Sequence, residues 1–138
     1  MTRPLTVADA MLRLPTVHPA DLAVAEARAA FDSSEKTHLL LLTSGGLLVN
    51  TVTRADLEAE VDPGQPAATA GTLLSRTVAP DGPLGHARHD MLRRGQRRLA
   101  VVDDSMHLLG LLCLKLSLTG FCTDEGVVAM RRTRRAIH

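Results

Sequence analysis

The chain has 138 residues, of which 45% are hydrophobic and 22% are charged, and its net charge is +1. This length fits one ordinary domain or two small halves that share a core, and the balanced charge excludes a chain that binds polyanions over its whole surface. Trp and Tyr are absent and only two Phe are present. This composition argues against a reader of single-stranded nucleic acid, because such proteins stack bases on aromatic rings.

No segment of the sequence predicts passage into or across a membrane. The longest apolar runs cover residues 39–42 and 108–114, whereas a membrane-spanning helix needs roughly 20 apolar residues. The residues that follow Met1 lack the apolar core of a signal peptide, so we expect a cytoplasmic protein. In that reducing compartment we expect the only two cysteines, Cys113 and Cys122, to be free and partly buried thiols, not a disulfide.

The first half of the chain predicts helices, a strand and a hairpin in a recognisable order. Thr6 caps a short helix, and Asp9 completes an imperfect capping box. Ser44-Gly45-Gly46 predicts the turn of a hairpin, because glycine adopts the positive φ that tight turns need. The expected elements are a helix at 7–12, a strand at 16–18 that ends at Pro19, an alanine-rich helix at 20–33 that places Val24, Ala27 and Phe31 on one face, a hairpin at 37–52 and a helix at 53–60.

The second half repeats this order after a linker. Residues 62–70 combine proline, glycine and alanine and predict that linker. Gly95 is expected to end the main helix of this half. The chain finishes with a basic tail at residues 131–138. The expected elements are a helical turn at 72–75, a strand at 77–79, a helix at 81–94, strands at 98–103 and 107–112, and a last helix that begins at Thr123 or Asp124.

Comparison of the chain with itself supports an internal repeat. Thr16-Val17 matches Thr77-Val78 and, after one deletion, Leu39–Leu42 match Leu99–Val102. Neither copy alone buries enough apolar surface to fold comfortably. We therefore expect the two copies to pack about a pseudo-twofold axis, with a cleft between them in which a ligand can bind.

The most regular part of the second copy is the strand–turn–strand segment Arg97–Leu112, which contains Val-Val-Asp before the turn and Leu-Gly after it. Together with Thr53-Arg54-Ala55-Asp56 and the order of elements, this segment resembles a tandem pair of CBS domains over residues 7–128. The resemblance implies an α+β fold of two β-α-β-β-α repeats, at residues 1–61 and 71–130. The first copy departs from the family pattern at Leu42-Thr43, where Val-Asp is usual, and at Asn50, where glycine is usual.

The resemblance also implies a ligand and the residues that bind it. Adenosine-containing ligands often bind in CBS-domain pairs, where a Thr or Ser after the last strand contacts phosphate or ribose and an Asp three residues later accepts the ribose hydroxyls. A carboxylate suits this role because it accepts two hydrogen bonds, and a helix N-terminus favours anions. The residues that match in the first repeat are Thr53 and Asp56, with Arg54 as an added charge for phosphate and Thr16, Val17 and His18 as backbone contacts to the base.

The second repeat departs from this pattern. The positions that correspond to Thr53 and Asp56 are Cys113 and Leu116, whose side chains cannot bind ribose. Thr77 and Val78 remain, so that half-site is degenerate. We therefore expect at most one nucleotide-type site in the chain.

Simpler interpretations stay open beside this one. A Thr-x-x-Asp sequence where a strand meets a helix is also an ordinary helix cap, in which Thr53 binds a backbone N–H. His86 and His89 share a helix face, but two imidazoles without a third ligand make a poor metal site, so we expect no metal. No phosphate loop, nucleophile elbow or pair of catalytic carboxylates is present in the sequence. We therefore expect no catalytic residue, no cofactor and no enzymatic activity.

Three functions compete. The first is a regulatory module that senses an adenine nucleotide or a related adenosyl metabolite. The second is a ligand-poor scaffold that acts by dimerisation or by docking on an unidentified protein, since paired modules of this family commonly form flat homodimers. The third, least favoured, is nucleic-acid binding through the arginine-rich tail.

Overall fold

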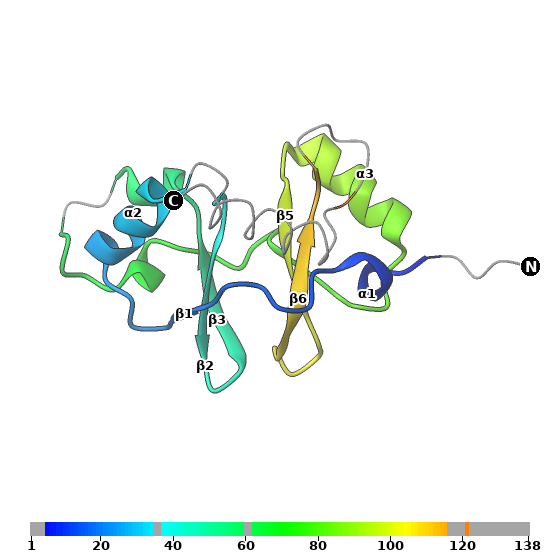
Figure 1. The fold of residues 1–138 in the computed structure, drawn as a ribbon, viewed down its shortest axis with the longest axis horizontal. Coiled ribbons are helices and arrows are strands. Elements are labelled where there is room, and N and C mark those ends of the chain that lie inside the picture. Colours follow the sequence, from blue (N-terminus) through cyan, green and yellow to red (C-terminus); the bar gives the residue numbers. More distant parts are fainter. Residues whose placement is uncertain (1–4, 35–36, 60–61, 116–120, 122–138) are drawn as a thin grey trace, which may run out of the picture. The chain divides into compact units, whose positions relative to one another are not determined.

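The computed structural model describes residues 5–34, 37–59, 62–115 and 121 (Figure 1). The contacts among these residues group them into two compact units, each built from more than one stretch of chain. The first-sheet unit contains Thr16–Thr77 and Val102–Leu108, and the second-sheet unit contains the chain up to Pro15, Val78–Val101 and the chain from Leu109. The repeats predicted from the sequence divide the chain differently, because they assign residues 1–15 to the first repeat.

A three-stranded sheet in the order β1-β2-β3 organises the first-sheet unit. β1 (His18–Pro19) runs parallel to β2 (Leu40–Ser44), which forms an antiparallel hairpin with β3 (Leu47–Val52). Gly45 and Gly46 have φ values of 58° and 83°, which confirms the predicted glycine turn. β1 begins at His18, which is the last residue of the strand predicted at residues 16–18. Pro19 is accommodated because β1 is an edge strand, and the next amide, that of Ala20, donates to the carbonyl of Thr43.

The core of the first-sheet unit lies between this sheet and α2 (Val24–Asp32) (Figure 1). Val24, Ala27 and Phe31 are buried on one face of α2, as their helical spacing predicts. They pack in one cluster with buried residues of β2 and β3, among them Leu42 and Val52. The small alanine side chains allow the helix to approach the sheet closely.

The stretch predicted as a linker is folded onto this core. Within residues 62–70, a short 3-10 helix, η2 (Ala67–Thr69), carries the fully buried Ala67. The amide of Ala67 donates to the carbonyl of Leu22, and the amide of Val24 donates to the carbonyl of Gln65. Proline and glycine in this stretch therefore shape a packed turn that covers the start of α2, and its role as a linker between the two repeats stays a prediction.

The helix predicted at residues 53–60 is a single 3-10 turn, η1 (Ala55–Leu57), within the described residues. Its apolar side chain, Leu57, is buried in the core. Nη2 of Arg28 donates to the carbonyl oxygen of Leu57 at 3.0 Å. This bond satisfies a carbonyl that a longer helix would satisfy with a downstream amide.

The second-sheet unit repeats the architecture. Its sheet has the order β4-β5-β6, formed by β4 (Thr77–Val78), β5 (Arg98–Val102) and β6 (Leu108–Cys113). α3 (Leu84–Arg94) ends at Gly95 with φ 68°, as predicted. α1 (Val7–Ala10) places the buried Val7 in the same cluster as Met91 and Leu112. The two units together confirm the α+β class, while the pseudo-twofold relation between them stays a prediction.

Cys113 is buried and disulfide-bonded. The prediction of a free thiol at Cys113 was therefore wrong, because an argument from the cellular compartment does not address the geometry of the fold. Cys122, Leu116, the predicted last helix and the basic tail lie outside the described residues. Among the described residues, no helix is both long and apolar enough to cross a membrane.

Candidate ligand-binding site

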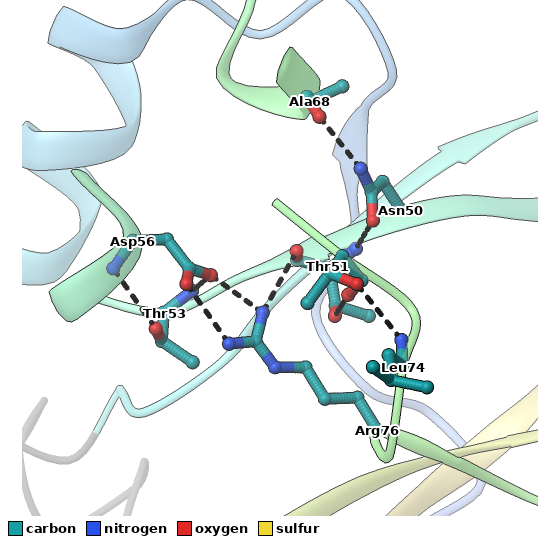
Figure 2. A network of polar contacts seen from close by, with 8 residues as sticks. Asn50, Thr51, Thr53, Asp56, Ala68, Leu74 and Arg76 are labelled. Carbon is teal, nitrogen blue, oxygen red and sulfur yellow. Dashed lines mark hydrogen bonds and ion pairs between the residues drawn. The ribbon is translucent and has the colours of Figure 1, made fainter. Parts of the chain in front are cut away.

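Thr53 and Asp56 meet at the point where β3 ends and η1 begins (Figure 2). The backbone amide of Thr53 donates to Oδ2 of Asp56 at 2.8 Å, and the amide of Asp56 donates to Oγ1 of Thr53 at 3.3 Å. Each side chain thus satisfies the backbone amide of the other, as in a capping box. The geometry confirms that this pair forms a cap, which was the simpler interpretation of the sequence.

Arg76 binds the other side of the Asp56 carboxylate. Its Nη1 lies 2.6 Å from Oδ2 and its Nη2 lies 3.1 Å from Oδ1, so the guanidinium and the carboxylate form a two-bond ion pair (Figure 2). Nη1 also donates to the backbone carbonyl of Thr51 at 3.3 Å. The side chains of Arg76 and Asp56 are only 15% and 17% exposed, so water screens this pair less than it screens a surface ion pair.

A tight connection to β3 holds the loop that carries Arg76. The amide of Thr72 donates to the carbonyl of Thr51 at 3.0 Å, and the buried hydroxyl of Thr51 donates to the carbonyl of Thr72. A Cβ atom on Gly71 would lie 2.2 Å from the carbonyl oxygen of Thr51, so only glycine permits this close approach. Ser75 then turns the chain with a φ of 60°, directly before Arg76.

The charge of Asp56 is set by its partners. Burial raises the pKa of Asp56, but the hydrogen bonds from Arg76 and from the Thr53 amide, together with the positive charge of Arg76, outweigh that effect and lower the pKa below its ordinary value. The carboxylate is therefore ionised and held in one orientation at neutral pH.

Asn50 braces the same region from β3. Its Nδ2 donates to the carbonyl of Ala68 at 2.7 Å, and its Oδ1 accepts from the amide of Thr51 at 2.9 Å. Asn50 therefore ties η2 to the strand that ends in the cap (Figure 2). At the matching position of the second copy, Gly110 lies so close to Leu12 that a Cβ atom would stand 2.5 Å from its carbonyl oxygen. In the first copy, the side chain of Asn50 forms two hydrogen bonds that a glycine at this position could not form.

Comparisons with known proteins show what the fold of this chain is similar to. Residues 66–115 match the family model of the CBS domain. The CBS domain pair of protein MJ0100, in complex with 5′-methylthioadenosine and S-adenosyl-L-methionine, superposes with a TM-score of 0.63 over 96% of this chain and 99% of that chain, at 19% identity. The chain has the fold of a CBS-domain pair. This confirms the resemblance inferred from the sequence.

Two further structures of CBS domains are similar. A CBS domain protein from Pyrobaculum aerophilum complexed with AMP gives a TM-score of 0.64 over 83% of this chain and 95% of that chain, at 20% identity. The CBS domains of a transcriptional regulator from Streptococcus pneumoniae give 0.63 over 79% and 92%, at 15% identity. A comparison with curated protein sequences found no match.

Arg54 lies apart from the ion pair of Asp56 and Arg76. Its Nη2 donates to the carbonyl of Phe31 at 2.7 Å and its Nη1 contacts Oδ1 of Asp32 at 3.1 Å. Its guanidinium also lies 5.4 Å from the centre of the Phe31 ring. The cation thus binds the C-terminal end of α2, where the helix dipole favours positive charge.

The remaining predicted contacts lie near β1 and β4. Thr16 and Val17 are exposed residues that precede β1, and the partly buried His18 pairs with Leu42 of β2. Thr77 and Val78 form β4 and are partly buried. Their roles as contacts to a base, and the binding role of Thr53, Arg54 and Asp56, stay predictions.

Metal binding receives no support from the described part of the chain. No group of three His, Cys, Asp or Glu side chains there could hold an ion. His86 and His89 are both exposed on α3.

Arg76 is the residue of the site that the sequence reasoning missed. It is separated from Asp56 by an entire packed turn, and the stretch between them was interpreted as a linker. The available signal was chemical, because a partly buried carboxylate after a strand needs a cation, and Arg76 is the only Lys or Arg between Arg54 and Arg88.

Proposed function

We propose that this CBS-domain pair is a non-enzymatic regulatory module that binds an adenosyl ligand through Thr53 and Asp56. The observation that carries the proposal is an ionised carboxylate, 17% exposed, oriented at the end of β3 by hydrogen bonds on both sides. Two proteins with the same fold are known in complex with AMP or with adenosyl compounds. A carboxylate in this position accepts hydrogen bonds from the two hydroxyls of a ribose.

The other predicted site residues complete the proposal. The hydroxyl of Thr53 faces the Asp56 amide and supplies a further polar contact. We assign the base to the backbone before and within β1, at Thr16, Val17 and His18, and we keep Arg54 as an additional positive charge. The module is proposed to act in the cytoplasm and to transmit ligand binding to a partner protein.

Calorimetric titration with AMP, ADP, ATP, NADH and S-adenosylmethionine tests this function. We expect at least one of these compounds to bind, and an Asp56→Asn variant to bind it roughly tenfold or more weakly, because a neutral amide accepts hydrogen bonds less strongly than a carboxylate. Asp81→Asn is the matched control, since Asp81 is an exposed aspartate of the second-sheet unit. If none of the five compounds binds, or if Asp56→Asn binds as the wild type does, the proposal is wrong.

A ligand-poor scaffold is the second candidate, and three observations favour it. Arg76 already engages both oxygens of Asp56, and the buried Cys113 replaces the polar residue in the second copy. The first-sheet unit also exposes four large apolar side chains, with exposed fractions of 47% for Val17, 40% for Leu47, 44% for Val49 and 80% for Leu74. If the protein is such a scaffold, we expect light scattering to detect a homodimer with or without nucleotide. A monomer at all concentrations would exclude a scaffold that acts by dimerisation.

A further inference from the structure

We propose that Arg76 makes the site selective for adenosyl ligands that carry a phosphate, because its guanidinium moves from the Asp56 carboxylate to the phosphate as the ligand binds. This inference rests on the proposed function and specifies the ligand class. It assigns two roles to Arg76. Without a ligand, Arg76 blocks the carboxylate, and with a phosphate-bearing ligand it becomes part of the binding site.

The blocking role follows from the number of acceptor positions. A carboxylate offers about four lone-pair positions for hydrogen bonds. Within the described part of the chain, Oδ2 of Asp56 accepts from the Thr53 amide and from Nη1 of Arg76, and Oδ1 accepts from Nη2 of Arg76. A ribose presents two hydroxyls as donors. The carboxylate therefore cannot receive both hydroxyls until Arg76 releases at least one of its bonds.

The preference for phosphate follows from the burial of Arg76. The Arg76 side chain is only 15% exposed, so its guanidinium cannot lose its anionic partner without a large cost in free energy, because a poorly hydrated charge is left unpaired. A phosphate supplies a new partner with the same two-bond geometry. Adenosine and 5′-methylthioadenosine carry no anionic group and supply none. Each of these must break the ion pair without a replacement.

The backbone around Arg76 confines the exchange to the side chain. The loop before it is fixed to β3 by the two hydrogen bonds between Thr51 and Thr72 and by the close approach of Gly71. The side chain keeps a second anchor in the carbonyl of Thr51, at 3.3 Å from Nη1. A rotation of the guanidinium about Nη1 is therefore sufficient to move Arg76 from the carboxylate to the phosphate, and no rearrangement of the sheet is needed.

The experiment compares AMP with adenosine by calorimetry, at one fixed ionic strength, on the wild type, Arg76→Gln, Arg76→Lys and Arg93→Gln. Arg93 is the matched control, because it is an exposed arginine of α3 paired with Asp90. For the wild type and for Arg93→Gln we expect AMP to bind roughly tenfold to a hundredfold more tightly than adenosine. For Arg76→Gln we expect this ratio to approach one, because AMP binds more weakly and adenosine binds more tightly than to the wild type.

The gain in adenosine affinity distinguishes the exchange from simple phosphate binding. Glutamine releases the carboxylate, whereas Arg76→Lys keeps the charge, loses the two-bond geometry and is expected to give an intermediate ratio. If Arg76→Gln weakens AMP but leaves adenosine unchanged, or if the wild type binds both equally, the exchange is overturned while the proposed function stands. If neither compound nor any other adenosyl compound binds, the proposed function fails and this inference fails with it. Should Arg76→Gln not fold, the wild-type ratio and the Arg76→Lys ratio decide.

Discussion

The hydroxyl of Thr51 donates a hydrogen bond to the carbonyl of Thr72, and the amide of Thr72 donates one back to the carbonyl of Thr51. Thr51 is a fully buried polar residue at the end of β3. The two bonds attach the loop before Arg76 to the strand that precedes Asp56. The position of the Arg76 guanidinium thus depends on two threonines that are not themselves members of the ion pair.

Thr51→Val tests this attachment, because valine keeps the shape of threonine and removes only the hydroxyl. The carbonyl of Thr72 then loses its buried donor, and we expect the free energy of unfolding to fall by about 1–3 kcal/mol. Urea unfolding followed by circular dichroism measures the change. Thr69→Val is the control, since the Thr69 hydroxyl donates to the carbonyl of Pro66 at an exposed site, and it should cost clearly less. Equal losses of unfolding free energy in the two variants would show that the buried hydrogen bond stabilises the protein no more than the exposed one does.

Gly71 offers a second test of the same attachment. A Cβ atom there would lie 2.2 Å from the carbonyl oxygen of Thr51 and 2.9 Å from Cγ2 of Val52. Both distances are too short for any side chain, and the nearer atom is backbone, so the loop must shift. We expect Gly71→Ala to destabilise the protein by about 2 kcal/mol or more, and to weaken AMP binding because Arg76 is displaced.

Gly85→Ala provides the opposite expectation with the same chemical change. Gly85 lies within α3, and a Cβ atom there meets nothing within 4 Å. Alanine is favoured over glycine in a helix by about 1 kcal/mol, so this variant should be more stable than the wild type. A destabilised Gly85→Ala or a neutral Gly71→Ala, measured by urea unfolding, would contradict the packing described for these positions.

Local patterns in the sequence were sufficient for much of the fold. Glycine at the β2–β3 turn and at Gly95, and apolar spacing along α2, act within a few residues of the structure they specify. The Thr53–Asp56 cap is also local, since its two residues are three positions apart. Such interactions depend on backbone geometry that neighbouring residues determine among themselves, so the sequence could predict them.

The interactions that the sequence did not reveal join distant segments. Arg76 reaches Asp56 only because residues 62–70 fold back over α2, through the buried Ala67 and its bond to Leu22. Proline and glycine in that stretch are equally typical of a linker and of a packed turn, and only the tertiary contacts decide between them. The candidate site was therefore predictable only in part. The sequence predicted the cap of Thr53 and Asp56, but it did not predict that Arg76 pairs with Asp56.

The pH dependence of stability tests the ion pair directly. Because the hydrogen bonds and charge of Arg76 and the Thr53 amide lower the pKa of Asp56 in the folded chain, folding favours the ionised carboxylate. The resulting stabilisation is fully present above the unfolded pKa of about 3.9, and it is lost as the pH falls from there through the lower folded pKa. The wild type should exceed Asp56→Asn in free energy of unfolding by about 1–3 kcal/mol at pH 7, and this difference should shrink between about pH 4 and pH 2. Asp81→Asn, which removes an exposed carboxylate outside the Asp56–Arg76 pair, corrects for acid effects on the rest of the chain. A difference that stays constant or grows on acidification would show that Arg76 does not stabilise the ionised form of Asp56.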